Sequence, residues 1–350
     1  MSRFGRFFLC VALALPLFVT GCGKVDEEAQ RARVEKEMKQ WLVSKIRDFR
    51  LAAQDLQTAA PLTPGRGWDA QEDARAIAAM KDAWGRAREA YELVEGAVAP
   101  LFPESDTATD ARYDDFLTIL GAAGDPKPFD AEGIVGVHAI ERILWADSIP
   151  TETLEFERGL PGFRPAAFPA TEAEARDFKE KLCAKLVSDI ASLEQQLAPV
   201  ELDIAFAFRG LIDLTNEQLE KVDRASTGRE ESRYAQSTLR DLRANREGCL
   251  AAYKIFQPWL LSRGGSELDQ QVLASFERLK SSYDALPGAA IPRPPQGWSS
   301  LEPNPAHAAT PFGRLFQVVK RETDDSQKGS LSTSLMSVAD TLGLPKAVLR

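Results

Sequence analysis

Apolar residues recur every three or four positions along most of this chain, and this spacing constrains the fold more than any other feature. From Val34 to Leu56, for example, apolar residues follow helical steps with charged residues between them, as on one face of an amphipathic helix. Similar patterns cover 69–98, 171–197, 202–222, 230–261 and 268–286, with shorter ones at 113–122, 136–145, 312–322 and 331–341. No stretch alternates apolar and polar residues with a period of two, so the sequence predicts an all-α fold.

Prolines and glycines separate the predicted helices. The segment 151–169 is rich in Gly, Pro and Phe and is predicted to be a long ordered loop, and 287–311 holds seven prolines in 25 residues, too many for regular structure. A break at Pro199 suggests two units, since the chain is longer than a usual helical domain. We therefore predict two antiparallel helical bundles, at 31–198 and 199–350.

The N-terminus has the layout of a secretory signal. A short basic region containing Arg3 and Arg6 precedes an apolar run from Phe7 to Val19 that is too short to span a bilayer comfortably. We predict a signal peptide at residues 1–21.

The run ends in Val-Thr-Gly-Cys, which resembles the lipidation site of bacterial lipoproteins, with cleavage before Cys22; the alternative is an ordinary signal peptide followed by a chance cysteine. The prediction is lipidation at Cys22, a tether over 22–30 and a periplasm-facing protein in the cell envelope. Gly23 follows the cysteine rather than an aspartate, which favours the outer membrane.

Charge and cysteine content narrow the choice of partners. The net charge of −9 argues against nucleic-acid binding, which requires a basic face, and is compatible with attracting cations. Beyond the N-terminal segment only Cys183 and Cys249 remain. They either pair or stay free, and because their spacing gives no support for pairing we predict two buried free thiols.

The segment 136–145 contains the most suggestive polar pair. His138 is one of only two histidines in the chain and stands three positions before Glu141, so on a helix both side chains project from one face. An imidazole beside a carboxylate is half of a site for iron or zinc. The alternative is a core histidine paired with its helix neighbour.

Other polar residues could complete such a site. Glu92 and Glu95 have the same i, i+3 spacing, and Asp241 and Asn245 lie on one polar stripe of their predicted helix. Solvated helix faces would explain both pairs equally well. The second histidine, His307, lies in the proline-rich loop.

Four segments together resemble the imelysin family, which includes components of bacterial iron-uptake systems and proteins classed as peptidases. In chain order they are AWGRAREAYELVE at 83–95, GVHAIERILW at 136–145, GLPGFRPAAFPATEAEA at 159–175 and RYAQSTLRDLRANREG at 233–248. The second is similar to the family signature GxHxxE. The resemblance covers both halves of the chain, but Gln236 stands where the last motif has a histidine.

This resemblance implies two helical bundles related by duplication, a location in the cell envelope and a metal site between the bundles. It implies iron as the bound metal, with zinc or another divalent metal as alternatives. The ligands that it implies are His138, Glu141, Glu92, Glu95, Asp241 and Asn245.

The leading hypothesis is a lipid-anchored protein that binds iron for uptake and works with a permease or another envelope protein. A zinc peptidase is a second reading, but Arg142 follows Glu141 where an inverted zincin motif, HxxEH, needs a histidine. A helical scaffold that binds no metal is the third.

Overall fold

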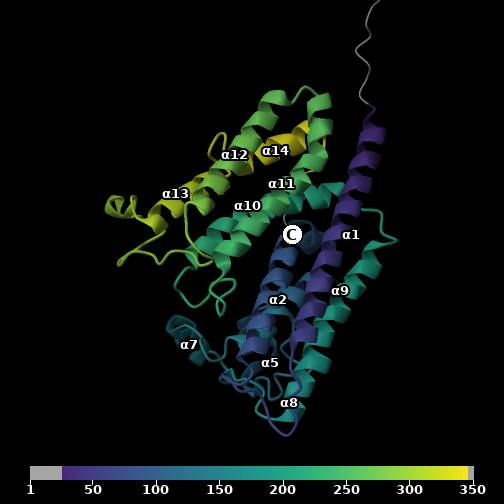
Figure 1. The fold of residues 1–350 in the computed structure, drawn as a ribbon. Helices are drawn as coiled ribbons and strands as arrows, with labels where there is room; N and C mark the ends of the chain where they lie inside the picture. Colours follow the sequence, from purple (N-terminus) through teal and green to yellow (C-terminus); the bar gives the residue numbers. More distant parts are fainter. Residues whose placement is uncertain (1–25, 346–350) are drawn as a thin grey trace, which may run out of the picture.

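The computed structural model describes residues 26–345, and within that range it is helical with no β-strand, which confirms the all-α prediction (Figure 1). The helices are α1 (Glu27–Ala59), α2 (Ala74–Glu92), α3 (Glu95–Leu101), α4 (Pro103–Asp110), α5 (Tyr113–Leu120), α6 (Gly136–Leu144), α7 (Thr151–Arg158), α8 (Glu172–Asp177), α9 (Ala184–Leu197), α10 (Ile204–Asp223), α11 (Thr238–Ser262), α12 (Ser266–Asp284), α13 (Pro311–Thr323) and α14 (Leu331–Leu342). The predicted signal peptide and Cys22 lie outside the described residues, and residues 27–30 of the predicted tether belong to α1.

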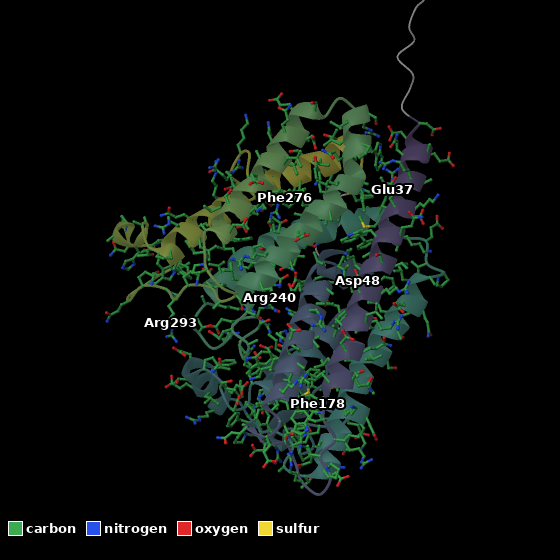
Figure 2. All side chains as sticks on the ribbon, in the orientation of Figure 1. Glu37, Asp48, Phe178, Arg240, Phe276 and Arg293 are labelled. Atoms are coloured by element: carbon green, nitrogen blue, oxygen red, sulfur yellow. The ribbon has the colours of Figure 1, made fainter. Side chains whose placement is uncertain are left out.

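The helices form two groups that meet near the middle of the molecule. In the lower group of Figure 1, α1, α2 and α9 run side by side, and the upper group contains α10 to α14. Figure 2 marks one core residue in each group, Phe178 below and Phe276 above, and both are buried. The long helix α1 reaches both groups, because Arg33 on its first turns donates to the carbonyl of Ile255 on α11. The boundary near residue 198 and the relation by duplication stay predictions.

Sequence periodicity and capping explain most of these elements. The buried residues of α1 include Val34, Met38 and Leu56 at the predicted spacing. Thr171 and Glu174 form a capping box at the start of α8, since Thr171 Oγ1 accepts from the Glu174 amide and Glu174 Oε2 accepts from the Thr171 amide. Both remaining cysteines are free and buried, as predicted.

Three predicted boundaries were wrong. The segment predicted as a loop over 151–169 begins with helix α7, because its glycines and prolines all follow Arg158. The predicted helix 69–98 is interrupted after Glu92 by a two-residue turn, and α3 starts at Glu95. The helix predicted from 230 begins only at Thr238, after a turn-rich segment in which Gln236 has a positive φ of 53°.

Glycines allow the two groups to approach each other closely at the break between α2 and α3. A Cβ added to Gly210 on α10 would lie 1.5 Å from the carbonyl oxygen of Gly96 on α3. A Cβ added to Gly248 on α11 would lie 2.0 Å from the carbonyl oxygen of Leu93. Only glycine permits these backbone contacts, and they bring Glu92 and Glu95 beside α10 and α11.

None of the helices within residues 26–345 has the length and apolar character needed to cross a membrane.

We predict that Gly210→Ala lowers the free energy of unfolding by about 3 kcal/mol, because the added methyl group cannot fit without moving α10 away from α3. Urea unfolding would measure this loss. Gly159→Ala is the matched control, since its Cβ would meet only the carbonyl of Phe156, at 3.4 Å. This substitution should change the free energy of unfolding by less than about 0.5 kcal/mol. Equal effects of the two substitutions would contradict the close helix contact.

Candidate metal centre

The glycine that opens α6 determines where His138 lies. Gly136 has a φ of 85°, and a Cβ there would lie 2.5 Å from the carbonyl oxygen of Thr109. The absence of a side chain therefore lets α6 begin against the last turn of α4. On the other side, Trp84 Nε1 of α2 donates to the carbonyl of Val137 at 2.9 Å. These two contacts place His138 next to Asp110, the final residue of α4.

Glu141 holds the imidazole of His138 in one orientation. The Nδ1 atom of His138 lies 2.7 Å from Glu141 Oε2. The other oxygen of Glu141 accepts backbone hydrogen bonds from Tyr234, at 2.9 Å, and from Ala235, at 2.8 Å. A carboxylate only accepts, so Nδ1 carries a proton and the lone pair of the neutral imidazole is on Nε2. This is the arrangement by which carboxylates orient metal-binding histidines.

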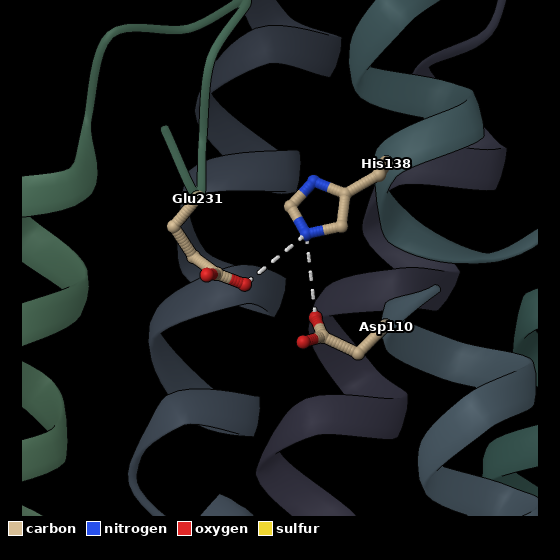
Figure 3. Close-up of side chains that lie close together, drawn as sticks. All are labelled: Asp110, His138 and Glu231. Atoms are coloured by element: carbon tan, nitrogen blue, oxygen red, sulfur yellow. Dashed lines mark ion pairs between the residues drawn. The ribbon is translucent and has the colours of Figure 1, made fainter. Parts of the chain in front are cut away.

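The Nε2 atom of His138 faces two carboxylates. It lies 3.4 Å from Asp110 Oδ1 and 3.8 Å from Glu231 Oε1 (Figure 3). His138 is 1% exposed, and Nε2 has no hydrogen-bond partner. Within residues 26–345, these three side chains form the one group of His, Cys, Asp or Glu whose ligand atoms could hold a metal ion, with the atoms within 4.8 Å of one another. One imidazole nitrogen and two carboxylate oxygens fit a first-row transition metal.

The pKa of His138 reflects the same surroundings. Burial alone lowers it, but the hydrogen bond to Glu141 and the nearby carboxylates of Asp110 and Glu231 outweigh burial and raise it well above the ordinary value. Without a metal, a proton on Nε2 would neutralise part of the negative charge, and a bound metal ion would replace that proton.

Arg88 lies behind this group and is fully buried. Its guanidinium pairs with Glu92 and Asp110, and it lies 3.1 Å from Glu231 Oε1 and 3.9 Å from Asp241 Oδ1. Four carboxylates from separate segments of the chain therefore share one cation. A buried charge of this kind is stable only when it is paired, so Arg88 ties these segments together.

Three of the sequence-predicted ligands form a separate inner cluster with Lys221 of α10. The Nζ atom of Lys221 lies 3.4 Å from Glu92 Oε2, 3.3 Å from Glu95 Oε2 and 3.1 Å from Asn245 Oδ1. The Asn245 amide also donates to Glu95 Oε2 at 2.8 Å. Burial lowers the pKa of Lys221, but the charges of Glu92 and Glu95 outweigh it and raise the pKa well above its usual value. The cluster thus holds a charged ammonium.

Three further residues from the sequence analysis lie outside the group of His138, Asp110 and Glu231. Asp241 accepts a hydrogen bond from Ser232 Oγ at 2.6 Å, and burial, opposed by Arg88, raises its pKa to about 6. The side chain of Gln236 donates to the carbonyl of Arg233 in its own loop at 2.8 Å. His307 is remote from the candidate centre in sequence and stacks on Trp298 in the proline-rich loop.

Two of the three candidate ligands, Asp110 and Glu231, were not predicted from the sequence. Asp110 ends α4, a helix that the sequence pattern does not predict, and Glu231 lies in a turn-rich segment where the pattern predicts a helix. The available signal for Glu231 was its position two residues before the motif RYAQS.

An acidic cavity of about 400 Å³ gives solvent access to the centre. Asp110 and Glu231 line it, together with five other carboxylates and two arginines. These other charged residues are Glu95, Asp106, Asp115, Glu217, Glu220, Arg112 and Arg224. Burial raises the pKa of Glu217 to about 8, opposed by Lys221. A cavity with this excess of acids attracts cations.

The sequence profile of the imelysin family matches residues 40–310, and the chain therefore belongs to this family. The match confirms the resemblance that the four motifs suggested.

Two named relatives extend the comparison. An iron uptake system component EfeO from Yersinia pseudotuberculosis serotype I (strain IP32953) is 24% identical over 205 residues, which cover 59% of this chain and 44% of the relative. The EfeO component from Escherichia coli O1:K1 / APEC is 25% identical over 203 residues, covering 58% and 43%. The chain thus spans less than half of the length of these relatives.

Asp106 in the cavity generates a pH-dependent prediction. Burial raises the pKa of Asp106 from 3.8 to about 7. The hydrogen bond from Tyr91 lowers this pKa, and the negative charge of Asp110 raises it. A pKa raised on folding contributes stability that is present below about pH 4 and lost as the pH rises through 7. Asp106→Asn keeps an acceptor for Tyr91 without the charge. It should stabilise the metal-free protein more at pH 8 than at pH 5, by on the order of 2 kcal/mol.

Urea unfolding of both proteins in chelator, at the two pH values, measures this difference. Asp48→Asn on the exposed side of α1 is the matched control (Figure 2). A gain for Asp106→Asn that does not depend on pH would contradict the raised pKa.

Proposed function

We propose that this protein is a cell-envelope component that binds iron for uptake, with Asp110, His138 and Glu231 as the ligands and Glu141 as the residue that orients His138. The observation that carries the proposal is the buried Nε2 of His138, which has no hydrogen-bond partner and lies beside two carboxylates that line an acidic cavity. The kinship with iron-uptake components supports iron as the cargo.

The donor set suits an ion that must be released again. Three side chains leave coordination positions open to water or to a transported ligand, and oxygen donors exchange iron more readily than thiolates do. Arg88 contributes to this exchange. It contacts the same oxygens, Asp110 Oδ1 and Glu231 Oε1, that face His138. An incoming ion must share those oxygens with the guanidinium, which weakens binding relative to a site without it.

The other predicted ligands have different roles in this proposal. Glu92, Glu95 and Asn245 hold Lys221, and Asp241 balances the charge of Arg88. They shape the field around the centre without contacting the ion. Zinc or another divalent metal could occupy the same three ligands, because imidazole and carboxylate accept both.

The geometry favours ion binding over peptide hydrolysis. A zinc peptidase needs a carboxylate base free to take a proton from metal-bound water. Both oxygens of Glu141 are already engaged, one by His138 and the other by two backbone amides. The candidate ligand group also contains a single histidine.

The lipid anchor and the outer membrane complete the proposal. The sequence Val-Thr-Gly-Cys at 19–22 supports lipidation of Cys22, which would keep the metal centre near a membrane and close to an iron-uptake permease or another envelope protein.

We predict that His138→Ala abolishes the binding of ferrous iron by the mature protein. Glu141→Gln should weaken binding about 10- to 100-fold, because it loosens the orientation of the imidazole without removing a ligand. Anaerobic calorimetric titration would measure the affinities. Since a ligand bound only to the native state stabilises it by mass action, iron should also raise the Tm of the wild type and not that of His138→Ala.

The chain provides a matched control in His307→Ala, which makes the same substitution at the only other histidine. Its iron affinity should equal that of the wild type. Unchanged binding in His138→Ala would refute the proposed centre, and equal losses in both histidine variants would show that a histidine-independent effect is being measured.

We further predict that Cys22→Ser prevents lipid attachment. Labelled palmitate should be incorporated into the wild-type protein and not into the variant, and the variant should leave the membrane fraction. Cys183→Ser is the control, because Cys183 is buried. Retention of the label by Cys22→Ser would disprove the anchor.

A further inference from the structure

The inner cluster has the geometry of a cation-binding site. Its cation is the side-chain ammonium of Lys221. Three oxygens converge on Lys221 Nζ at 3.1 to 3.4 Å, from Glu92 and Glu95 on either side of the α2–α3 break and from Asn245 on α11. Lys221 is 1% exposed, Glu92 and Asn245 are 0% exposed and Glu95 is 6% exposed. The ammonium therefore has no bulk water around it and depends on these oxygens.

The orientation of Asn245 supports this interpretation. Its Oδ1 atom points to Lys221, while Nδ2 donates to Glu95 Oε2 and to the backbone carbonyl of Glu92 at 3.1 Å. Gln218 donates to the same Oδ1 at 3.1 Å and accepts from the hydroxyl of Tyr283 at 2.9 Å. This second layer of hydrogen bonds fixes the amide with its oxygen toward the cation.

We propose that Glu92, Glu95 and Asn245 form a second cation site, which the protein fills with the Lys221 ammonium, and that removing this ammonium converts the cluster into a site for a divalent metal ion. Two carboxylates and an amide oxygen are hard ligands, so the ion would be of the class of Mn²⁺ or Ca²⁺. In the wild type the lysine excludes such an ion. Helix α3 therefore packs against α10 and α11 without any bound metal.

Space and access are compatible with the conversion. Truncating Lys221 would vacate the volume of its side chain for an ion and its water ligands. The oxygens would have to move inward, because metal–oxygen bonds are about 2.0 to 2.6 Å long. Glu95 also lines the acidic cavity, which provides the path from solvent.

The experiment compares His138→Ala with His138→Ala/Lys221→Ala, so that the outer centre is disabled in both proteins. Equilibrium dialysis against Mn²⁺ should give no tightly bound ion for the first protein and one ion per chain for the second. The Tm of the double variant should be reduced in chelator, because two buried carboxylates lose their cation, and should recover when Mn²⁺ is added.

A third protein with Glu92→Gln and Glu95→Gln added to the double variant is the control. Its cluster is neutral, so it should fold in chelator and bind no Mn²⁺ at this site. A folded double variant that binds no ion would overturn the proposal. The proposal would also be overturned if the double variant stayed unfolded in the presence of Mn²⁺ while the neutral control folded.

Failure of the proposed iron centre would be distinguishable from failure of this inference. The iron centre is judged by His138→Ala against the wild type with iron. The inner site is judged only by the difference that Lys221→Ala makes within the His138→Ala background.

Discussion

The buried guanidinium of Arg88 is the interaction on which the rest of the site depends. It pairs with carboxylates from α2, α4, the segment before α11 and α11 itself. Leaving a buried charge unpaired costs several kcal/mol, so these four segments must meet where Arg88 lies. The two helix groups are thereby joined through charge as well as through the glycine contacts of α3 and α10, and the candidate metal centre lies at this junction.

Acids outnumber cations around that junction, and this imbalance connects structure with function. Arg88 and Lys221 lie inside the network, and Arg112 contacts Glu231 at 3.8 Å. The carboxylates of Glu92, Glu95, Asp110, Glu231 and Asp241 each contact at least one of these cations. The protein neutralises part of the excess with its own ammonium in the inner cluster. The outer group instead places His138 Nε2 beside Asp110 and Glu231, two carboxylates that line the acidic cavity. A mobile cation is therefore expected at the outer group.

The sequence was sufficient for local features of this arrangement. Helical periodicity predicted the all-α fold and a helix beginning near residue 171, because this signal arises from neighbours along the chain. The spacing of His138 and Glu141 predicted a contact that the structure contains, at 2.7 Å. The spacing of Glu92 and Glu95 also predicted a shared face, although a helix break separates the two residues.

Only the tertiary structure determined which groups complete each cluster. Asp110 and Glu231 reach His138 from positions 28 residues before it and 93 residues after it, and no periodic pattern relates such distant positions. Lys221, on an otherwise ordinary amphipathic helix, becomes the partner of Glu92 and Glu95 because Gly96 and Gly210 let two backbones touch. By itself the sequence determined most of the helices and the His138–Glu141 pair. Long-range packing decided the ligands and their counter-ions, because burial and charge pairing depend on contacts made only in the folded chain.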